Sequence, residues 1–329
     1  MISNFLFVGL AAGLFCIGGW CWQMLTAANS MVVPTGSLTT ELVTLDIKKM
    51  RRRYLVHLPE SYNETLQWPV VIMFHGGGGT AKSAISTTEW TTKADKEGFI
   101  AVFPEGTSPN PSLPGRFIGN PQSWNDGSKR PTIRAAENGV NDIAYVSAMI
   151  DDLKKRYHVN HRQIYSTGFS NGASMSFRVG RELSSKIAAI APVAGHDWID
   201  NKPDRPVPLI FIVGAVDPLC PIEGGKVFIG KKSFGEKPKI RKMLSKWVRL
   251  HGGQEQSRQI FNKDQSKGEA FNRPGEFETV VLYIIGGHGH HWPGGKSLLG
   301  ERFAGKNTSQ LKATDVIWEF FKTHSLPEE

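Results

Sequence analysis

Cysteine is nearly absent from the chain. Only three cysteines occur among 329 residues, and two of them, Cys16 and Cys21, lie in an apolar N-terminal stretch. The rest of the chain keeps Cys220 alone, and a single thiol cannot form an internal disulfide bond. Disulfide-stabilised folds are therefore excluded, and stability must come from a hydrophobic core. We expect Cys220 to be a small buried residue rather than a nucleophile.

Charge is absent from residues 5–22. An uncharged apolar run of this length is about long enough to cross a bilayer as a helix. We interpret residues 1–30 as a secretory signal peptide cleaved after the small residues at 26–28, or as an uncleaved membrane anchor in residues 5–24. Both interpretations stay open, because the run is long for a signal peptide and no lysine or arginine precedes it. Either predicts export to an extracellular or periplasmic location, with membrane contact only through this segment if it is uncleaved.

Acidic residues are scarce in residues 226–249, where nine lysines and arginines accompany one acid, Glu236. The segment contributes much of the net charge of +9. It is either a solvated face of the fold or a surface weakly attracted to an anionic polymer, such as an acidic polysaccharide. Nucleic acid is not expected as a partner, because no nucleic-acid-binding motif accompanies the charge and the protein is expected to be exported.

Repeats and low-complexity tracts are absent too, and 40% of the residues are hydrophobic, so we expect one ordered domain over residues 38–325. Short, continuously apolar runs recur along it, as is typical of strands buried on both faces of a parallel sheet. Residues 41–47 and 53–59 are predicted to form an antiparallel pair at one edge of that sheet. The other predicted strands are 69–74, 98–103, 163–168, 187–193, 208–213 and 279–285.

Segments with a helical period separate these strands. Residues 143–157 follow a candidate N-cap, Asn141, and residues 240–248 carry an apolar stripe that should leave their basic side chains pointing outward. Strands alternating with helices predict a doubly wound α/β fold with a mostly parallel sheet. Residues 104–137 form a long loop of the kind that is usually functional, and residues 252–277 are predicted to be irregular.

One serine lies in the pattern G-x-S-x-G, which spans residues 168–172. The pattern alone is weakly specific, since a chain of this length contains it by chance about one time in ten. Its position between a strand-like run and a helix-like run is what a nucleophile elbow requires, because the tight turn presents the hydroxyl and leaves no room for side chains at the flanking glycines. We therefore interpret Ser170 as a catalytic nucleophile.

A serine hydroxyl needs a base, and the base needs an acid that orients it. Asp217 lies four residues beyond the run 208–213, and His290 lies five residues beyond 279–285. The order serine, aspartate, histidine is the one expected for this elbow. The sequence therefore predicts that Asp217 and His290 meet Ser170 at one edge of the sheet.

Negative charge that develops on a substrate oxygen needs backbone donors. Four glycines at 76–79 follow the predicted strand 69–74, and glycine allows the backbone to approach a substrate closely. We expect the N–H groups of Gly77 and Asn171 to form this oxyanion hole, with Gly78 as the substitute for Gly77.

Three histidines, His288, His290 and His291, lie within the stretch GGHGHHWPGG at residues 286–295. A zinc site is the alternative to a catalytic base, since this spacing could bind the metal. No carboxylate or cysteine at useful spacing accompanies the histidines, and a metal would occupy the imidazole that the serine requires. No metal or other cofactor is therefore expected.

The motifs "WNDG", "YSTGFSNGASMS", "GAVDPLCPIEGG" and "GHGHHWPGG" together resemble the polyhydroxybutyrate depolymerase/feruloyl esterase family of secreted α/β-hydrolases, which is similar to carbohydrate esterase family 1. The likeness spans residues 45–322. It implies a single-domain α/β-hydrolase fold without a large lid domain, and it implies that the catalytic histidine is His290, two residues before a Trp-Pro pair. Trp124 and Trp292 are then candidate walls of the substrate pocket, although Trp124 could instead be a buried aromatic that fixes its loop.

The leading hypothesis is an exported carboxylic ester hydrolase that acts through an acyl-enzyme. The resemblance implies feruloyl or acetyl esters of polysaccharide, or short polyhydroxyalkanoate oligomers, as small-molecule or polymer-linked substrates. A serine peptidase of the same fold and a non-catalytic protein that binds anionic polymer are the alternatives. His196 and Asp197 follow a predicted strand and are expected to be structural.

Overall fold

The computed structural model describes residues 31–32, 40–47, 50–130, 133–253, 256–271, 278–297 and 299–328. The expected signal peptide or anchor in residues 1–30 lies outside these ranges. Within them, no helix is both long enough and apolar enough to span a bilayer.

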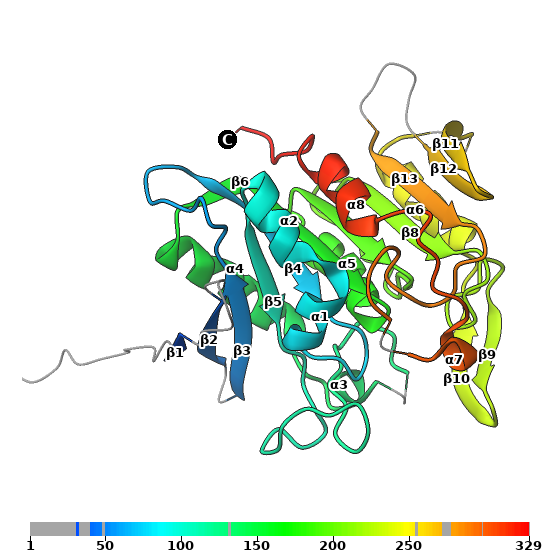
Figure 1. Ribbon diagram of the computed structural model, residues 1–329, viewed down its shortest axis with the longest axis horizontal. Coiled ribbons are helices and arrows are strands. Elements are labelled where there is room, and N and C mark those ends of the chain that lie inside the picture. Colours follow the sequence, from blue (N-terminus) through cyan, green and yellow to red (C-terminus); the bar gives the residue numbers. More distant parts are fainter. Residues whose placement is uncertain are drawn as a thin grey trace, which may run out of the picture.

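The described residues form an 11-stranded sheet that runs through the middle of the molecule (Figure 1). Six neighbouring strands in its centre are parallel, and antiparallel strands extend it at both edges. In spatial order the strands are β1 (Met31–Val32), β2 (Thr40–Ile47), β3 (Met50–His57), β5 (Ile100–Pro104), β4 (Trp68–Phe74), β6 (Val159–Phe169), β7 (Ala189–Val193), β8 (Leu209–Gly214), β13 (Val280–Ile285), β12 (Ser266–Ala270) and β11 (Arg258–Lys263).

The parallel centre of the sheet is the hydrophobic core, as the continuous apolar runs predict. Every residue of β5, β7 and β8 is buried. Strands with apolar side chains on both faces must be covered on both faces, which accounts for the helical layers on either side. The predicted α/β fold with a mostly parallel sheet is confirmed, and so is the antiparallel pair β2–β3 near one edge.

Helices cover the two faces of the sheet (Figure 1). On one face, Trp90 of α2 stacks on Phe321 of α8 at 6.4 Å between ring centroids. On the other face, Phe177 of α5 packs against Trp247 of α6 at 5.8 Å. The helices are α1 (Ala81–Thr88), α2 (Trp90–Glu97), α3 (Arg134–Glu137), α4 (Asp142–Arg156), α5 (Asn171–Glu182), α6 (Ile240–Leu250), α7 (Glu301–Ala304) and α8 (Ala313–Phe321).

Local sequence signals place two of these helices. The Asn141 side chain accepts a hydrogen bond from the Ala144 N–H at 2.9 Å, so it caps α4 as expected. The apolar stripe of α6 is buried, whereas Arg241 and Lys242 on the same helix are exposed. The outward orientation predicted for the basic side chains of α6 is confirmed at these two positions.

Two segments differ from the expectations. Residues 252–277 were predicted to be irregular, but β11 and β12 form a hairpin that pairs antiparallel with β13. The prediction is wrong because β11 is largely exposed at the sheet edge and therefore has no apolar period. Residues 225–237 form a separate two-stranded ribbon of β9 (Gly225–Ile229) and β10 (Lys232–Lys237). Lys237 at the end of this ribbon is only 5% exposed, so the interpretation of the whole basic segment as a solvated face is wrong there.

Candidate active site

Ser170 occupies the turn between β6 and α5. Its φ of 57° and ψ of −116° lie outside the conformations that L-residues prefer, so the turn holds the residue under strain. A Cβ at Gly168 would lie 2.3 Å from the carbonyl oxygen of Gly172, and a Cβ at Gly172 would lie 2.2 Å from that of Phe74. Both flanking positions therefore require glycine, and the geometry is that of the predicted elbow.

The structure brings Ser170, His290 and Asp217 together from three separate connections at the carboxyl ends of β6, β8 and β13. His290 Nε2 lies 2.9 Å from Ser170 Oγ, and His290 Nδ1 lies 2.8 Å from Asp217 Oδ2. The other carboxylate oxygen of Asp217 accepts hydrogen bonds from the N–H groups of Leu219 and Cys220 at 2.8 and 2.7 Å. Asp217 and His290 are 4% and 3% exposed, so the row of hydrogen bonds is largely shielded from water.

The two neighbouring histidines hold the turn that carries His290. His288 Nε2 bonds the carbonyl oxygen of His291, and its Nδ1 accepts the Thr308 N–H. His291 Nε2 donates to the carbonyl oxygen of Gly305 at 2.8 Å. Among the described residues, no three histidine, cysteine, aspartate or glutamate side chains are grouped so that they could hold a metal ion.

Hydrogen bonds to the Gly76 carbonyl group fix the orientation of the peptide between Gly76 and Gly77. The Gly76 oxygen accepts hydrogen bonds from His75 Nδ1 at 2.8 Å and from the Gly79 N–H at 2.9 Å. Because the N–H and C=O of a trans peptide point in opposite directions, these bonds also set the direction of the Gly77 N–H. That amide finds no acceptor among the described residues, and Gly77 lines the same cavity as Ser170.

The His75 side chain holds this peptide in its neutral imidazole form. Its Nε2 accepts the Gly106 N–H at 3.0 Å, which leaves the proton on Nδ1 for the bond to Gly76. Burial, aided by the nearby charge of Arg52, lowers the pKa of His75 from 6.5 to about 4, although the bond to Gly76 opposes the shift. Gly78 does not serve as the substitute donor, because its N–H donates to the carbonyl oxygen of Gln122 at 2.7 Å.

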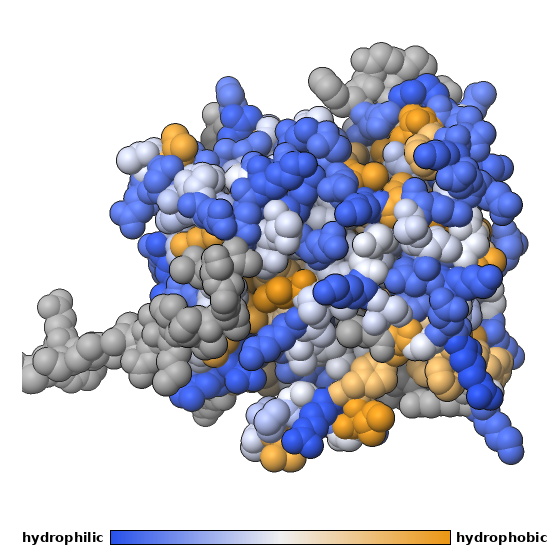
Figure 2. All heavy atoms as spheres, in the orientation of Figure 1, coloured by the Kyte–Doolittle hydropathy of each residue, from blue (hydrophilic) through white to orange (hydrophobic). Residues whose placement is uncertain are grey.

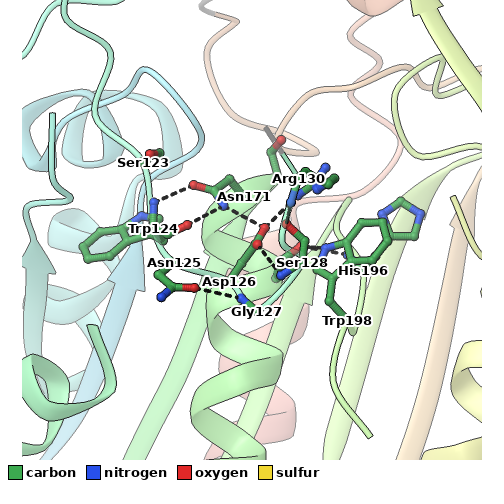
Figure 3. A network of polar contacts seen from close by, with 12 residues as sticks. Ser123, Trp124, Asn125, Asp126, Gly127, Ser128, Arg130, Asn171, His196 and Trp198 are labelled. Atoms are coloured by element: carbon green, nitrogen blue, oxygen red, sulfur yellow. Dashed lines mark hydrogen bonds and ion pairs between the residues drawn. The ribbon is translucent and has the colours of Figure 1, made fainter. Parts of the chain in front are cut away.

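The side chain of Asn171 is anchored by hydrogen bonds to the loop after β5 (Figure 3). Its Oδ1 accepts the Trp124 N–H at 2.8 Å, and its Nδ2 donates to the Trp124 carbonyl at 3.1 Å and to Asp126 Oδ2 at 2.8 Å. Arg130 donates to the same Asp126 oxygen at 2.7 Å. The loop that follows β5 is thereby tied to the first residue of α5.

The structure corrects the expectation for Trp124. Its side chain is 0% exposed and packs against Phe74 and His75, with ring centroids 5.1 and 5.0 Å away. The indole N–H donates to the His75 carbonyl oxygen at 2.9 Å. Trp124 therefore supports the glycine loop from behind and is not a wall of the cavity. Trp292 is not among the residues that line this cavity. It lines a second, small cavity beside His290, and its N–H donates to Thr314 Oγ1 at 3.0 Å.

Ser170 opens into a cavity of about 550 Å³, a size typical of small-molecule sites. Apolar side chains dominate its walls. They include Phe117, Phe169, Leu219, Phe234, Leu299 and Phe303. The loop after β5 supplies Phe117, and Figure 2 shows apolar surface gathered at the lower edge of the molecule, where this loop and α7 lie.

The sequence analysis did not predict several residues that line the cavity. His196 was expected to be structural, but it lines the cavity. Burial, with the positive charges of Lys237 and Arg130 adding to it, lowers its pKa well below 6.5, so the imidazole is neutral. Asp197 is structural as expected, because it binds Arg181 and the indole of Trp247. Nothing in the sequence marked Arg130 or Lys237 as a cavity residue, apart from the position of Arg130 in the long loop and of Lys237 in the basic segment.

Comparisons with known proteins agree with this fold. The putative esterase NocK of Nocardia uniformis subsp. tsuyamanensis is 25% identical over 309 residues, which cover 87% of this chain and 84% of that protein. Feruloyl esterase B of Piromyces equi is 26% identical over 84% of this chain, but the match covers 46% of that protein. The structure of an acetyl xylan esterase from Aspergillus awamori matches 76% of this chain and 94% of its own, with a TM-score of 0.54 and 14% identity.

The structural likeness, at this low identity, shows the fold alone, and that fold is the predicted α/β-hydrolase fold. The sequence profile of the phospholipase/carboxylesterase family matches residues 63–228, just over half of the 329 residues. The chain therefore belongs to the phospholipase/carboxylesterase family of α/β-hydrolases and is a carboxylic ester hydrolase.

Proposed function

We propose that the protein is a serine esterase that acts through an acyl-enzyme on Ser170. The observation that carries the proposal is the continuous row from Asp217 through His290 to Ser170, with contacts of 2.8 and 2.9 Å, at the wall of a largely apolar cavity. A hydroxyl in contact with an imidazole that a carboxylate orients is the arrangement that makes serine nucleophilic.

The reaction proceeds in two steps, acylation of Ser170 and hydrolysis of the acyl-enzyme. Ser170 Oγ forms a bond to the ester carbonyl carbon while His290 takes the hydroxyl proton, and His290 then returns that proton to the departing alcohol oxygen. Water next attacks the acyl-enzyme, again giving its proton to His290. The bond to Ser170 breaks, the acid is released, and the proton returns to the serine. Asp217 orients the imidazole and stabilises its charged form in both steps.

The N–H groups of Gly77 and Asn171 are proposed to bind the oxyanion that forms in each step. Support comes from the anchored Gly76 carbonyl, which directs the Gly77 N–H, and from the position of Asn171 directly after the nucleophile. Two fixed donors aimed at developing charge are worth roughly 3–4 kcal/mol each in enzymes of this kind.

The proposed substrates are feruloyl or acetyl esters of polysaccharide, or short polyhydroxyalkanoate oligomers. Relatives named as feruloyl esterases and the apolar walls of the cavity support this choice. Export, directed by residues 1–30, is also proposed, on the uncharged run at 5–22.

The test is hydrolysis of an ester panel by the purified protein. The panel contains 4-nitrophenyl acetate, methyl ferulate, acetylated xylan and 3-hydroxybutyrate oligomers, with a peptide amide as the competing substrate. We expect ester turnover that falls at least about 10³-fold in Ser170→Ala. Ser112→Ala, at an exposed serine of the loop after β5, is the matched control and should retain wild-type rates. Turnover of the peptide alone, or binding of xylan without turnover, would contradict the proposal.

A further inference from the structure

The charged side chains that line the cavity are all positive. Arg130, Arg134 and Lys237 contribute to its walls, and no aspartate or glutamate among the described residues does so. Arg130 is paired with buried Asp126, and Arg134 is paired with Glu137 on the protein surface. Lys237 is the exception, because no carboxylate of the described residues contacts it.

Lys237 is an unusual lysine for its position. It is 5% exposed, whereas lysine is rarely buried without a partner. Its ammonium group donates one hydrogen bond, to the carbonyl oxygen of Phe234 at 2.9 Å, and lies 5.2 Å from the centroid of the Trp198 ring. An ammonium group has three donors, so two remain for a ligand.

Arg130 shares the same aromatic ring. Its guanidinium carbon lies 4.5 Å from the centroid of Trp198, so the indole lies beside both cations. Arg130 Nε is buried and has no acceptor among the described residues. Among the described residues, Asp126 is the one carboxylate in contact with this pair of cations. The cluster therefore keeps a net charge of about +1, which a monovalent anion would balance.

We propose that Lys237, with Arg130 beside it, forms a subsite for a carboxylate group, and that the preferred substrates are esters that also carry a free carboxylate. This inference rests on the proposed function, because the anion is recognised as part of the substrate that Ser170 attacks. The subsite belongs to the same cavity as the proposed nucleophile, because Lys237 and Arg130 line it together with Ser170. A terminal hydroxy-acid unit of an oligoester carries such a carboxylate.

The protonation of Lys237 gives the subsite a pH dependence. Burial, with the charge of Arg130 adding to it, lowers the pKa of Lys237 from 10.5 to about 8, while Cys220 and Asp126 act in the opposite direction. The charged form binds a carboxylate. The ratio of kcat/KM for an anionic ester to kcat/KM for a neutral ester of equal length should therefore be highest below this pKa. It should fall as the pH rises through about 8.

The experiment compares anionic and neutral esters of equal chain length. Mono-4-nitrophenyl adipate and suberate are paired with 4-nitrophenyl hexanoate and octanoate, and the ratio of kcat/KM values is measured at pH 7. For at least one pair, we expect Lys237→Met to lower the ratio by about 10- to 100-fold, the effect of losing a buried charge-assisted hydrogen bond. Lys237→Arg should restore part of it, and Lys242→Met, at an exposed lysine of α6, should leave it unchanged.

A binding measurement tests the carboxylate subsite even if the protein hydrolyses none of these esters. Titration calorimetry on Ser170→Ala should detect monomethyl adipate or monomethyl suberate, which carry one free carboxylate, binding more tightly than the neutral esters methyl hexanoate or methyl octanoate, with the difference abolished by adding Lys237→Met. Absence of all ester turnover would overturn the proposed function but leave this titration to judge the subsite. Equal ratios in wild type and Lys237→Met, or equal affinity for the monomethyl dicarboxylates and the neutral methyl esters, would overturn the subsite itself.

Discussion

The side-chain amide of Asn171 donates to the buried carboxylate of Asp126 at 2.8 Å (Figure 3), and Asn171 lines the same cavity as Ser170. One residue therefore joins the loop after β5 to the turn that carries the nucleophile. Since Asp126 also binds Arg130, the same carboxylate connects this turn to the cationic wall of the cavity.

Replacing Asn171 with alanine keeps its backbone N–H but removes this connection. The backbone N–H and carbonyl of Trp124 would lose their hydrogen bonds to this side chain, and buried Asp126 would lose one of its partners, which should lower the free energy of unfolding by about 2–4 kcal/mol. We also expect kcat to fall more than KM rises, because the oxyanion donor loses its support. Chemical denaturation and steady-state kinetics measure both effects. Asn201→Ala, at an exposed asparagine, is the control, and an equal effect there would contradict the account.

Gly172→Ala should prevent folding to the active state. The added Cβ would lie 2.2 Å from the Phe74 carbonyl oxygen and 2.5 Å from that of His75, and both atoms belong to backbone that cannot move independently. Gly300→Ala is the matched control, because its φ is −66° and no atom lies within 4 Å of the added Cβ. Soluble yield and thermal unfolding distinguish the two variants. A Gly172→Ala protein as stable as wild type would show that β4 and α5 do not pack as closely as described.

His75→Gln should change how stability depends on pH. The folded-state pKa of His75 is lowered to about 4 by burial, against 6.5 when unperturbed, so between these values the unfolded chain binds the proton more readily. The stability that neutral His75 contributes is therefore present above pH 6.5 and is lost as the pH falls toward 4. The difference in free energy of unfolding between wild type and variant should narrow by about 3 kcal/mol across this range. Denaturation curves at several pH values test this, and a constant difference would contradict a neutral, buried His75.

Much of the fold follows from apolar periodicity, because each central strand is buried on both faces and each main helix on one. β8 and α6 illustrate this, since their buried residues are those that the sequence pattern marks. The hairpin of β11 and β12 was missed because edge strands in contact with water need no such pattern. The positions of Ser170, Asp217 and His290 were predictable because strand ends in a parallel sheet meet at one edge.

The walls of the cavity were not predictable in this way. Trp124 was a candidate wall of the pocket or a buried aromatic that fixes its loop. The structure shows the second, because its indole donates to the His75 carbonyl oxygen and is fully buried. Lys237 looked like one of many solvated lysines, and only the path of the β9–β10 ribbon turns it inward. Such positions depend on how loops and ribbons cross the sheet edge, and no short-range sequence period encodes that path.

Covalent labelling of the nucleophile tests the central claim most directly. The protein is treated with a fluorophosphonate, and the modified residue is located by peptide mass spectrometry while ester hydrolysis is followed in parallel. We predict a single adduct on Ser170 that forms in step with the loss of activity and forms far more slowly in His290→Ala, since the hydroxyl then lacks its base. Complete loss of activity with Ser170 unmodified, or wild-type ester turnover by Ser170→Ala, would contradict the account.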